Sequence, residues 1–497
     1  MIGGWYLFFM EAKMDSSVLD QLHRLIEKMM AYYSIPGCAI GIIDGEERHV
    51  LSFGTRDIRS GAPFTEKTVS GIGSCSKSMT AAAVLRLEEK GLLDIDAPIA
   101  SYIPGFALYD QGASAMVTLR DMLCHRTGVA GHDGTWPDNS ISRPDYVRRL
   151  RYLAPNAPFR TKAQYSNVMY NAIGGIMEMV TGKKWETIIR EEILQPLHMD
   201  RTFCLMDEAA QEENCAMPHW WSHGLHAVDR WNIDQAGPCG GIMADVEDMM
   251  KWLAFHIRGG TDEKGRSLLS PVHFLDMHTP QILMDYPHVR GGRSLGYGLG
   301  WRIMEYHGHV VEQHTGKIEG YSAFQFYLPG TGKGAVYLQN LHAPDNPFIF
   351  AVQGFLIDAF SGDPQEDWYH IYTETGKDHA PEDMYHHLEY NYMPVRRIEG
   401  TSLSHKLSDY TGRYEHPGYG FFTVREEAGR LLLDERAVEG LLLTHFHYDT
   451  FEVQGIKEDT DLYTLPLTFT TGSDGRIDGF ILPMEPKVAP LRFKKAD

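Results

Sequence analysis

Ser74 and Lys77 are the residues of this sequence whose types and spacing most directly suggest covalent chemistry. They precede a run rich in Ala and Leu that predicts a helix ending near Gly91. Ser74 is therefore expected at the N-terminus of that helix, with Lys77 on the same face. A serine hydroxyl becomes a nucleophile when a base takes its proton, and a buried lysine amine can be that base. The unpaired N–H groups of a helix N-terminus would stabilise the resulting oxyanion.

The Ser-x-x-Lys spacing alone is a weak signal, because an N-capping serine followed by a surface lysine has the same pattern. A hydrolase of this kind also needs a proton relay, a second oxyanion donor and an anchor for the substrate. Tyr165 and Asn167 offer a phenol and an amide that point the same way in an extended segment. A tyrosine beside a lysinium can have a lowered pKa and act as general base and acid.

A third motif, His314-Thr315-Gly316, lies near the end of a predicted strand. Gly316 lacks a side chain, so the next backbone N–H can approach a substrate closely. The sequence thus holds the three groups of residues that such a hydrolase requires.

The elements expected around these motifs form an antiparallel sheet with helices packed against it. Helical periodicity over 16–33 is followed by a buried strand over 38–43, a tight turn and a partner strand over 49–53. Further predicted helices cover 119–123, 167–180 and 246–256, and further strands cover 297–304, 309–313, 322–328 and 334–339. The sheet would be made from the two ends of the first 360 residues, with a helical region between them.

The sequence changes character after residue 361. Residues 362–405 are polar and indicate a linker with one helix near 382–390, whereas 406–497 show short alternating strands typical of a small β-barrel. These strands are predicted over 421–426, 430–434, 441–446, 467–471 and 477–482. We therefore expect an N-terminal extension (1–15), a main α+β domain (16–361), a linker (362–405) and a barrel domain (406–497).

Composition and charge narrow the function classes. The chain is 43% hydrophobic and 23% charged, with a formal net charge of −20, which argues against nucleic acid and anionic membrane surfaces as partners. Its six cysteines fit neither a disulfide framework nor paired metal-ligand spacing. The apolar stretch 1–9 is too short to span a bilayer and lacks the features of a signal peptide; either it packs on the domain or the natural start is Met14. We expect a cytoplasmic protein, with export as the alternative.

The order of the three motifs resembles that of class C β-lactamases, penicillin-binding proteins and related serine esterases, the peptidase S12-type superfamily. Segments 123–129, 196–199 and 240–249 match this group as well. The resemblance covers roughly residues 20 to 360. It implies an antiparallel sheet flanked by helices plus an all-helical subdomain, a β-lactamase/transpeptidase-like fold with the site between the two parts.

The resemblance also implies roles for individual residues. Ser74 would be the acylated nucleophile, and Lys77 its base or the charge that activates Tyr165. Tyr165 would protonate the leaving group and later activate the deacylating water. Asn167 would orient Lys77 and the substrate amide. The remaining expected site residues are the oxyanion donors, the backbone N–H groups of Ser74 and Lys317, and the substrate-orienting residues His314, Thr315 and Gly316. No cofactor is implied.

The third motif departs from the β-lactamase pattern, because His314 stands where β-lactamases and many penicillin-binding proteins carry lysine. A neutral histidine attracts a substrate carboxylate less than a lysine does, although Lys317 partly restores the charge. Histidine here looks more like the family's esterases and D-amino-acid amidases or aminopeptidases. The expected function is a serine hydrolase, cleaving a small ester or a short peptide or amide. The alternative is a penicillin-binding or sensor-type protein, or weak β-lactamase, that acylates with little turnover.

Three further segments suggest functions. Segments 410–414, 417–420 and 468–475 resemble the lipocalin-like domain appended to some of these hydrolases, where it would border or cap the cleft. The run His445-Phe446-His447-Tyr448-Asp449 resembles a zinc motif, but a solvated barrel strand is the preferred interpretation. Segment 219–224 offers either substrate-facing aromatic residues or ordinary packing, and the loop 125–132 is expected to be structural. The natural substrate and the oligomeric state stay open.

Overall fold

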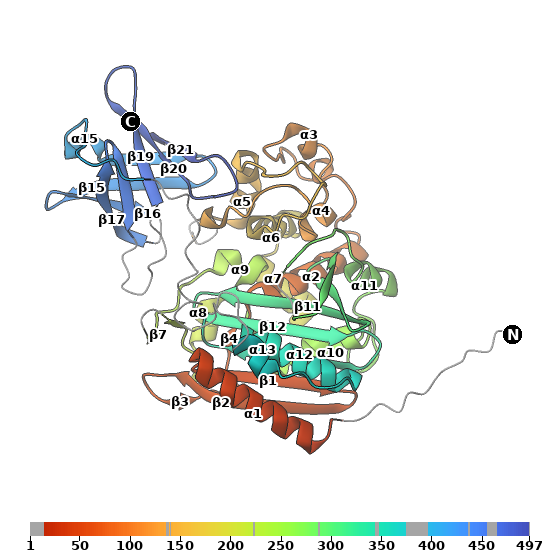
Figure 1. Ribbon diagram of the computed structural model, residues 1–497. Coiled ribbons are helices and arrows are strands. Elements are labelled where there is room, and N and C mark those ends of the chain that lie inside the picture. Colours follow the sequence, from red (N-terminus) through yellow and green to blue (C-terminus); the bar gives the residue numbers. More distant parts are fainter. Residues whose placement is uncertain are drawn as a thin grey trace.

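An eight-stranded antiparallel sheet forms the centre of the larger domain (Figure 1). The structure is a computed structural model and describes residues 14–135, 139, 141–221, 224–286, 289–342, 347–373, 396–435, 438–454 and 465–496. The strands are β1 (Gly37–Asp44), β2 (Glu47–Asp57), β3 (Ala62–Pro63), β9 (Arg293–Tyr297), β10 (Arg302–Tyr306), β11 (His309–Ile318), β12 (Tyr321–Leu328) and β13 (Lys333–Gln339). Their order is β3-β2-β1-β13-β12-β11-β10-β9. The sheet thus joins the two ends of this part of the chain, as predicted.

The strand predicted over 297–304 is wrong, because two strands occupy this region. β9 ends at Tyr297 and β10 begins at Arg302, with a turn closed by the hydrogen bond from Gly298 N to Trp301 O (2.8 Å). Gly300 in this turn has φ +81°, and a Cβ there would lie 2.9 Å from Lys77 O. The apolar and aromatic residues around the turn concealed this break.

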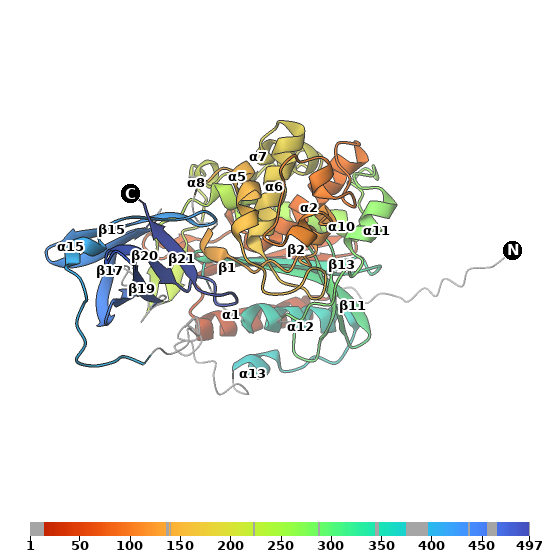
Figure 2. The same cartoon turned by 90° about the horizontal axis from the view of Figure 1, so that it is seen from above.

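One face of the sheet is covered by α1 (Ser16–Tyr33), α12 (Pro347–Ser361) and α13 (Trp368–Thr373) (Figure 2). The Asp15 carboxylate accepts a hydrogen bond from Val18 N (3.0 Å) and so caps α1, whose apolar stripe is buried. α13 lies within the expected linker and packs through the buried Trp368 onto α12. The helix expected near 382–390 and the extension 1–13 lie outside the described residues.

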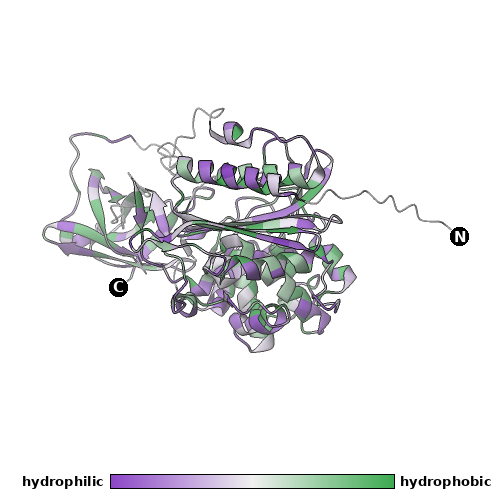
Figure 3. Ribbon diagram, turned by 90° about the horizontal axis from the view of Figure 1, so that it is seen from below, coloured by the Kyte–Doolittle hydropathy of each residue, from purple (hydrophilic) through white to green (hydrophobic). Residues whose placement is uncertain are grey.

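Helices on the opposite face carry most of the site. These are α2 (Ser76–Glu89), α10 (Val246–Ile257) and α11 (Pro271–Met277), together with a helical subdomain that includes α3 (Gln111–Ser114), α4 (Leu119–Leu123), α5 (Arg143–Arg149), α6 (Asn167–Thr181), α7 (Trp185–Ile189), α8 (Met206–Ala210) and α9 (Gly237–Gly240). Figure 3 shows the sheet between the two helical layers. α2 is buried on almost every side, which explains its run of alanines.

Short strands connect these helices. A three-stranded sheet contains β4 (Ser70–Gly71), β8 (Met243–Ala244) and β5 (Thr202–Phe203), and a hairpin contains β6 (His219–Trp221) and β7 (Leu225–Ala227). Among the described helices, none has both the length and the apolar character that a membrane span requires.

The C-terminal region forms a closed eight-stranded barrel, preceded by α15 (Leu407–Tyr410). Its strands are β14 (Gly412–His416), β15 (Gly420–Glu427), β16 (Arg430–Glu435), β17 (Val438–His447), β18 (Thr450–Gln454), β19 (Leu465–Thr471), β20 (Ile477–Leu482) and β21 (Leu491–Lys495). Pairing of β14 with β21 closes the barrel around stacked aromatic rings such as Phe422 and Phe493. The sequence predicted the barrel but missed β14, β18 and β21, because these short strands lack a long alternating run.

Candidate active site

Ser74 lies in the one-turn helix η1 (Gly73–Cys75), which leads directly into α2. Its side chain is half-buried. Strand β11 contacts this turn so closely that a Cβ on Gly73 would lie 2.3 Å from Lys317 N. A Cβ on Gly316 would lie 1.9 Å from Ile72 O and 3.1 Å from Ser74 N. Glycine at both positions therefore allows the backbone of η1 to contact the backbone of β11 directly. The two expected oxyanion donors, the N–H groups of Ser74 and Lys317, lie at this contact.

Lys77 is the second residue of α2, three residues after Ser74, and its side chain is fully buried. The Nζ atom lies 2.9 Å from Ser74 Oγ, 2.8 Å from Asn167 Oδ1 and 2.6 Å from Cys239 O. The amide and carbonyl oxygens only accept, so each takes one N–H of the lysine. The remaining contact of the nitrogen is with the serine hydroxyl. Transfer of a proton from the nucleophile to a base requires this contact.

Tyr165 lies two residues before α6, with its ring centroid 6.4 Å from that of His314 in β11. Its ring centroid lies 4.8 Å from Lys77 Nζ and 4.3 Å from the centroid of the His125 ring. The phenol is half-buried, and its hydroxyl forms no hydrogen bond to any part of the chain that the structure describes. Tyr165 therefore has a free polar group beside the serine–lysine pair.

Asn167 is held in one orientation by two partners of opposite character. Its Oδ1 accepts from Lys77, and its Nδ2 donates to Asp133 Oδ1 at 2.8 Å. A lysine only donates and a carboxylate only accepts, so the amide cannot be reversed without losing both bonds. The predicted contact with Lys77 is present, but sequence reasoning missed Asp133, which followed a histidine-rich loop and carried no separate signal.

His314 is fully buried in β11 and is neutral. Its Nδ1 lies 2.7 Å from Thr315 O, so this nitrogen carries the proton, and its Nε2 accepts from Tyr297 OH at 3.0 Å. Burial, together with the charges of Arg302 and Lys77, lowers the pKa of His314 well below its usual value. The third motif thus carries no charge on its histidine, as the sequence led us to expect.

Arg302 supplies a positive charge at the same place, and sequence reasoning missed it. From β10 its Nη1 donates to Thr315 Oγ1 at 3.0 Å, and its guanidinium lies 5.8 Å from the Tyr165 ring centroid. The sequence did contain one signal for this position. A tight turn at His307-Gly308 fixes the pairing of β10 with β11, and this pairing places Arg302 opposite Gln313. Lys317, the residue we expected to restore the charge, follows Gly316 directly in β11, but its side chain is exposed.

Three other candidate residues are buried, and their contacts are those of packing. His125 is buried between the rings of Tyr165, Tyr170 and Tyr297, and its Nδ1 accepts from Ser166 N at 3.2 Å. The Cys75 thiol donates to His314 O, and burial raises its pKa to about 12. Trp220 is buried and stacks on His342 with ring centroids 4.6 Å apart, while Ser222 and His223 lie outside the described residues.

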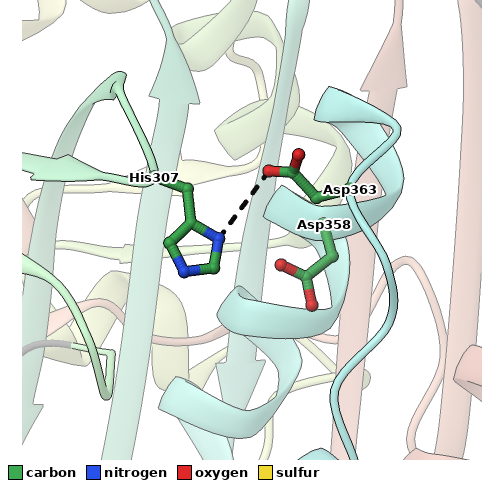
Figure 4. A group of neighbouring side chains, drawn as sticks. All are labelled: His307, Asp358 and Asp363. Atoms are coloured by element: carbon green, nitrogen blue, oxygen red, sulfur yellow. Dashed lines mark ion pairs between the residues drawn. The ribbon is translucent and has the colours of Figure 1, made fainter.

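Among the described residues, His307, Asp358 and Asp363 are the group whose donor atoms lie close enough to hold a metal, all within 4.8 Å of one another (Figure 4). His307 Nδ1 lies 3.8 Å from Asp363 Oδ2, but the Asp358 carboxylate already accepts from Tyr306 OH and Trp368 Nε1. The group belongs to the α12 side of the sheet, the face opposite α2. It has no contact with the serine–lysine site.

The zinc-like motif of the barrel does not converge on a common point. A β-bulge separates His445 from His447 in β17. The Nε2 of His445 lies 2.9 Å from Tyr448 O, whereas the Asp449 carboxylate accepts from Ser404 N at 3.0 Å. These separate partners favour the interpretation of a solvated strand.

Two family models match the chain. The β-lactamase model matches residues 22–351, and the model of a domain of unknown function (DUF3471) matches residues 396–495. An unguisins hydrolase of Aspergillus campestris is 25% identical over 432 residues, which cover 84% of this chain and 79% of that protein. Penicillin-binding protein 4 of Amycolatopsis lactamdurans is 26% identical over 315 residues, which cover 62% of this chain and 81% of that protein.

Solved structures show the same fold. The octameric penicillin-binding protein homologue from Pyrococcus abyssi has a TM-score of 0.60 at 22% identity and covers 96% of this chain and 100% of its own. The D-amino acid amidase from Ochrobactrum anthropi also has a TM-score of 0.60, at 21% identity, and covers 70% of this chain and 99% of its own. Since the family model spans two thirds of the sequence, this chain belongs to the β-lactamase family of serine acyl-enzyme hydrolases.

Proposed function

We propose that this protein is a serine hydrolase that forms a covalent acyl-enzyme on Ser74 and cleaves a short peptide, a small amide or a small ester. The observation that carries the proposal is the position of Lys77 Nζ, fully buried and 2.9 Å from Ser74 Oγ. Two of its hydrogen bonds go to Asn167 Oδ1 and Cys239 O. With these two bonds in place, the nitrogen faces the serine hydroxyl, the position that a base for Ser74 must occupy.

The reaction follows from these positions. Ser74 Oγ attacks the substrate carbonyl carbon and its proton passes to Lys77 Nζ, or to Tyr165 under the influence of the lysine charge. The oxyanion is stabilised by the backbone N–H groups of Ser74 and Lys317. Tyr165 then protonates the leaving group, and the bond between that group and the carbonyl carbon breaks. In the second half, the Tyr165 phenolate takes a proton from water, which attacks the carbonyl carbon of the acyl ester. The bond from this carbon to Ser74 Oγ then breaks, and Oγ regains its proton from the group that first accepted it, Lys77 or Tyr165, as the acid leaves.

The substrate class is supported by the relatives and by the third motif. One structural relative is a D-amino acid amidase and one sequence relative is an unguisins hydrolase, which favours amide bonds over simple esters. A neutral His314 gives a β-lactam carboxylate little attraction. A penicillin-binding or weak β-lactamase activity is the second candidate, and the charge of Arg302 beside Thr315 favours it.

The decisive experiment measures the intact mass of the protein after exposure to a fluorophosphonate probe. Wild type and Ser76→Ala, whose lost hydroxyl bonds to Gly73 O instead of facing Lys77, should each gain one adduct, and Ser74→Ala none. Hydrolysis of a p-nitrophenyl ester and of a D-alanyl anilide in the same samples chooses between ester and amide. A long-lived adduct with a penicillin selects the second candidate. Equal labelling of Ser74→Ala would overturn the proposal.

The proposal also covers the cellular compartment, the partners and the assembly of the protein. All six cysteines are buried free thiols, which suits a reducing, cytoplasmic compartment. The substrate would be a small molecule, and the net charge of −20 makes nucleic acid an unsuitable partner. The octameric relative makes self-assembly a point to measure, by light scattering of the purified chain.

A further inference from the structure

Two loops of the C-terminal barrel hold a turn that lies beside the active site. The turn is η3 (Asp133–Thr135) with the preceding His132. Glu485, in the loop between β20 and β21, accepts a hydrogen bond from His132 N at 2.6 Å. Tyr419, between β14 and β15, places its hydroxyl 2.7 Å from His132 Nδ1. Figure 1 shows the β20–β21 loop reaching from the barrel toward α5.

These contacts are buried and specific. Tyr419 and His132 are wholly buried, and Glu485 is 5% exposed. The His132 Nε2 lies 2.8 Å from Ala154 O, so Nε2 carries the proton and Nδ1 accepts from the Tyr419 hydroxyl. Burial lowers the pKa of His132, which keeps the ring in this neutral form. Each polar atom of the ring therefore has one suitable partner, and one of the two comes from the barrel.

The backbone at His132 needs this support. Its φ is +47°, a left-handed conformation that is unfavourable for a residue other than glycine. Such a conformation persists only where the surrounding structure holds it. Bonds from Thr135 to His132 O close the turn from within, whereas the bond to His132 N comes from Glu485, 353 residues later in the chain.

The next residue connects this turn to the reacting groups. Asp133 Oδ1 accepts from Asn167 Nδ2 at 2.8 Å, and Asn167 Oδ1 accepts from Lys77 Nζ at 2.8 Å. Without the Asp133 carboxylate, the Asn167 amide could rotate and turn its N–H groups toward the lysine, where donor would face donor. The orientation of the amide therefore depends on the position of Asp133.

We propose that Glu485 and Tyr419 of the barrel are positioning residues for the hydrolase site, acting through His132 and Asp133 on Asn167 and Lys77. The proposal rests on the function proposed above. The barrel is then part of the machinery of its own chain, because it fixes the turn whose carboxylate orients the asparagine. Its loss would misdirect Lys77 while leaving Ser74 in place.

A kinetic double-mutant cycle in the full-length protein tests the proposal, with the D-alanyl anilide or the ester as substrate, whichever is turned over. We expect Asp133→Ala to lower kcat about 30-fold, and Glu485→Ala or Tyr419→Phe to lower it about 5- to 10-fold with KM changed less than about twofold. Combining Glu485→Ala with Asp133→Ala should cost no more than Asp133→Ala alone, because both act on one chain of contacts. Asp133→Asn keeps an acceptor oxygen and should recover most of the rate.

The matched control is Tyr414→Phe, whose buried hydroxyl donates to Tyr410 O inside the barrel. It should leave kcat unchanged. The melting temperature of every variant is measured beside its rate, and if Glu485→Ala does not fold, the isosteric Tyr419→Phe decides alone.

Three results would overturn the inference: full kcat in Tyr419→Phe, multiplicative effects of Asp133→Ala and Glu485→Ala, or a loss shared by Tyr414→Phe. Labelling of Ser74→Ala by the fluorophosphonate would instead overturn the proposed function. The two failures are therefore distinguishable, since barrel variants with full rate leave Ser74-dependent labelling intact.

Discussion

Two polar clusters lie on the same strand, and only one of them is arranged to react. Glu312 and His314 are two residues apart on β11. His314 belongs to the serine–lysine site, whereas Glu312 accepts from the Tyr327 hydroxyl at 2.6 Å and pairs with His278. His278 Nε2 in turn lies 3.0 Å from His256 Nδ1 on α10. The second cluster thus contains the histidines, carboxylate and phenol that catalysis often uses.

The two clusters differ in how far their side chains are exposed. Glu312 and the three side chains around it are all buried, and they bond to one another. In the site, Lys77 is equally buried, but Ser74 and Tyr165 are only half-buried and so keep part of their surface accessible. Burial of the base combined with exposure of the nucleophile is what separates a reactive cluster from a stabilising one.

The largest expected effect tests the buried base. Lys77→Met should lower kcat/KM by about a thousandfold or more, because the serine proton loses its acceptor. The initial rate of fluorophosphonate labelling, followed by mass, measures the same loss at the acylation step. Retention of normal labelling in Lys77→Met would break the comparison at its first point.

Tyr165→Phe should lower kcat by about a hundredfold, since the ring remains while the proton donor is lost. If Tyr165 also activates the deacylating water, the acyl-enzyme accumulates, and mass measurements during turnover should detect it. Tyr297→Phe, which removes a neighbouring phenol that bonds to His314, serves as the control. Equal losses in both variants would assign the effect to packing.

The Glu312 cluster should behave in the opposite way. Glu312→Ala removes the buried carboxylate that accepts from the Tyr327 hydroxyl and pairs with His278, which should cost about 2–3 kcal/mol of unfolding free energy. The turnover number per folded molecule should stay within about twofold of wild type, because no group of this cluster reaches the substrate. Urea unfolding and active-site titration measure the two quantities. A stable but inactive variant would make this cluster part of the site.

Arg302→Met sharpens the comparison at the third motif. Loss of the guanidinium beside Thr315 should raise KM about tenfold for a substrate that carries a carboxylate and leave a neutral ester within about twofold. Arg302→Lys, which keeps the charge but not the fork of donors, should recover part of the loss. The same loss for both substrates would point to a structural role.

The smallest expected effect is the loss of stability at low pH that each buried histidine causes, and both clusters contain such histidines. Burial lowers the pKa of His125, His256 and His314 well below 6.5, so the unfolded chain binds protons that the folded chain refuses. Stability should therefore fall as the pH falls below the unfolded pKa, by about 1 kcal/mol per histidine between pH 6.5 and 5.5. Urea unfolding over this range gives the slope, and His256→Gln should make it shallower by about one histidine's share. An unchanged slope would contradict the assignment.

Local patterns were sufficient for the elements that carry the motifs. The helices around Ser74 and Asn167 and the first strand follow from periodicity and turn residues, and the structure has them close to their predicted bounds. The second strand was predicted over 49–53 and is longer in the structure, Glu47–Asp57. The barrel was visible as alternating strands, although its short members were not. The strand over 297–304 failed because apolar alternation continues through a turn that two glycines make.

The sequence by itself determined which groups could react: a serine and a lysine on one helix face, a phenol and an amide before a second helix, and a strand ending in His-Thr-Gly. These signals are short-range, so they survive without knowledge of the fold. Only the tertiary structure decided that Arg302 stands beside Thr315, that Asp133 orients Asn167, and that Glu485 supports the turn between them. These contacts depend on strand register and domain packing across up to 353 residues, and a local pattern contains no information about such distances.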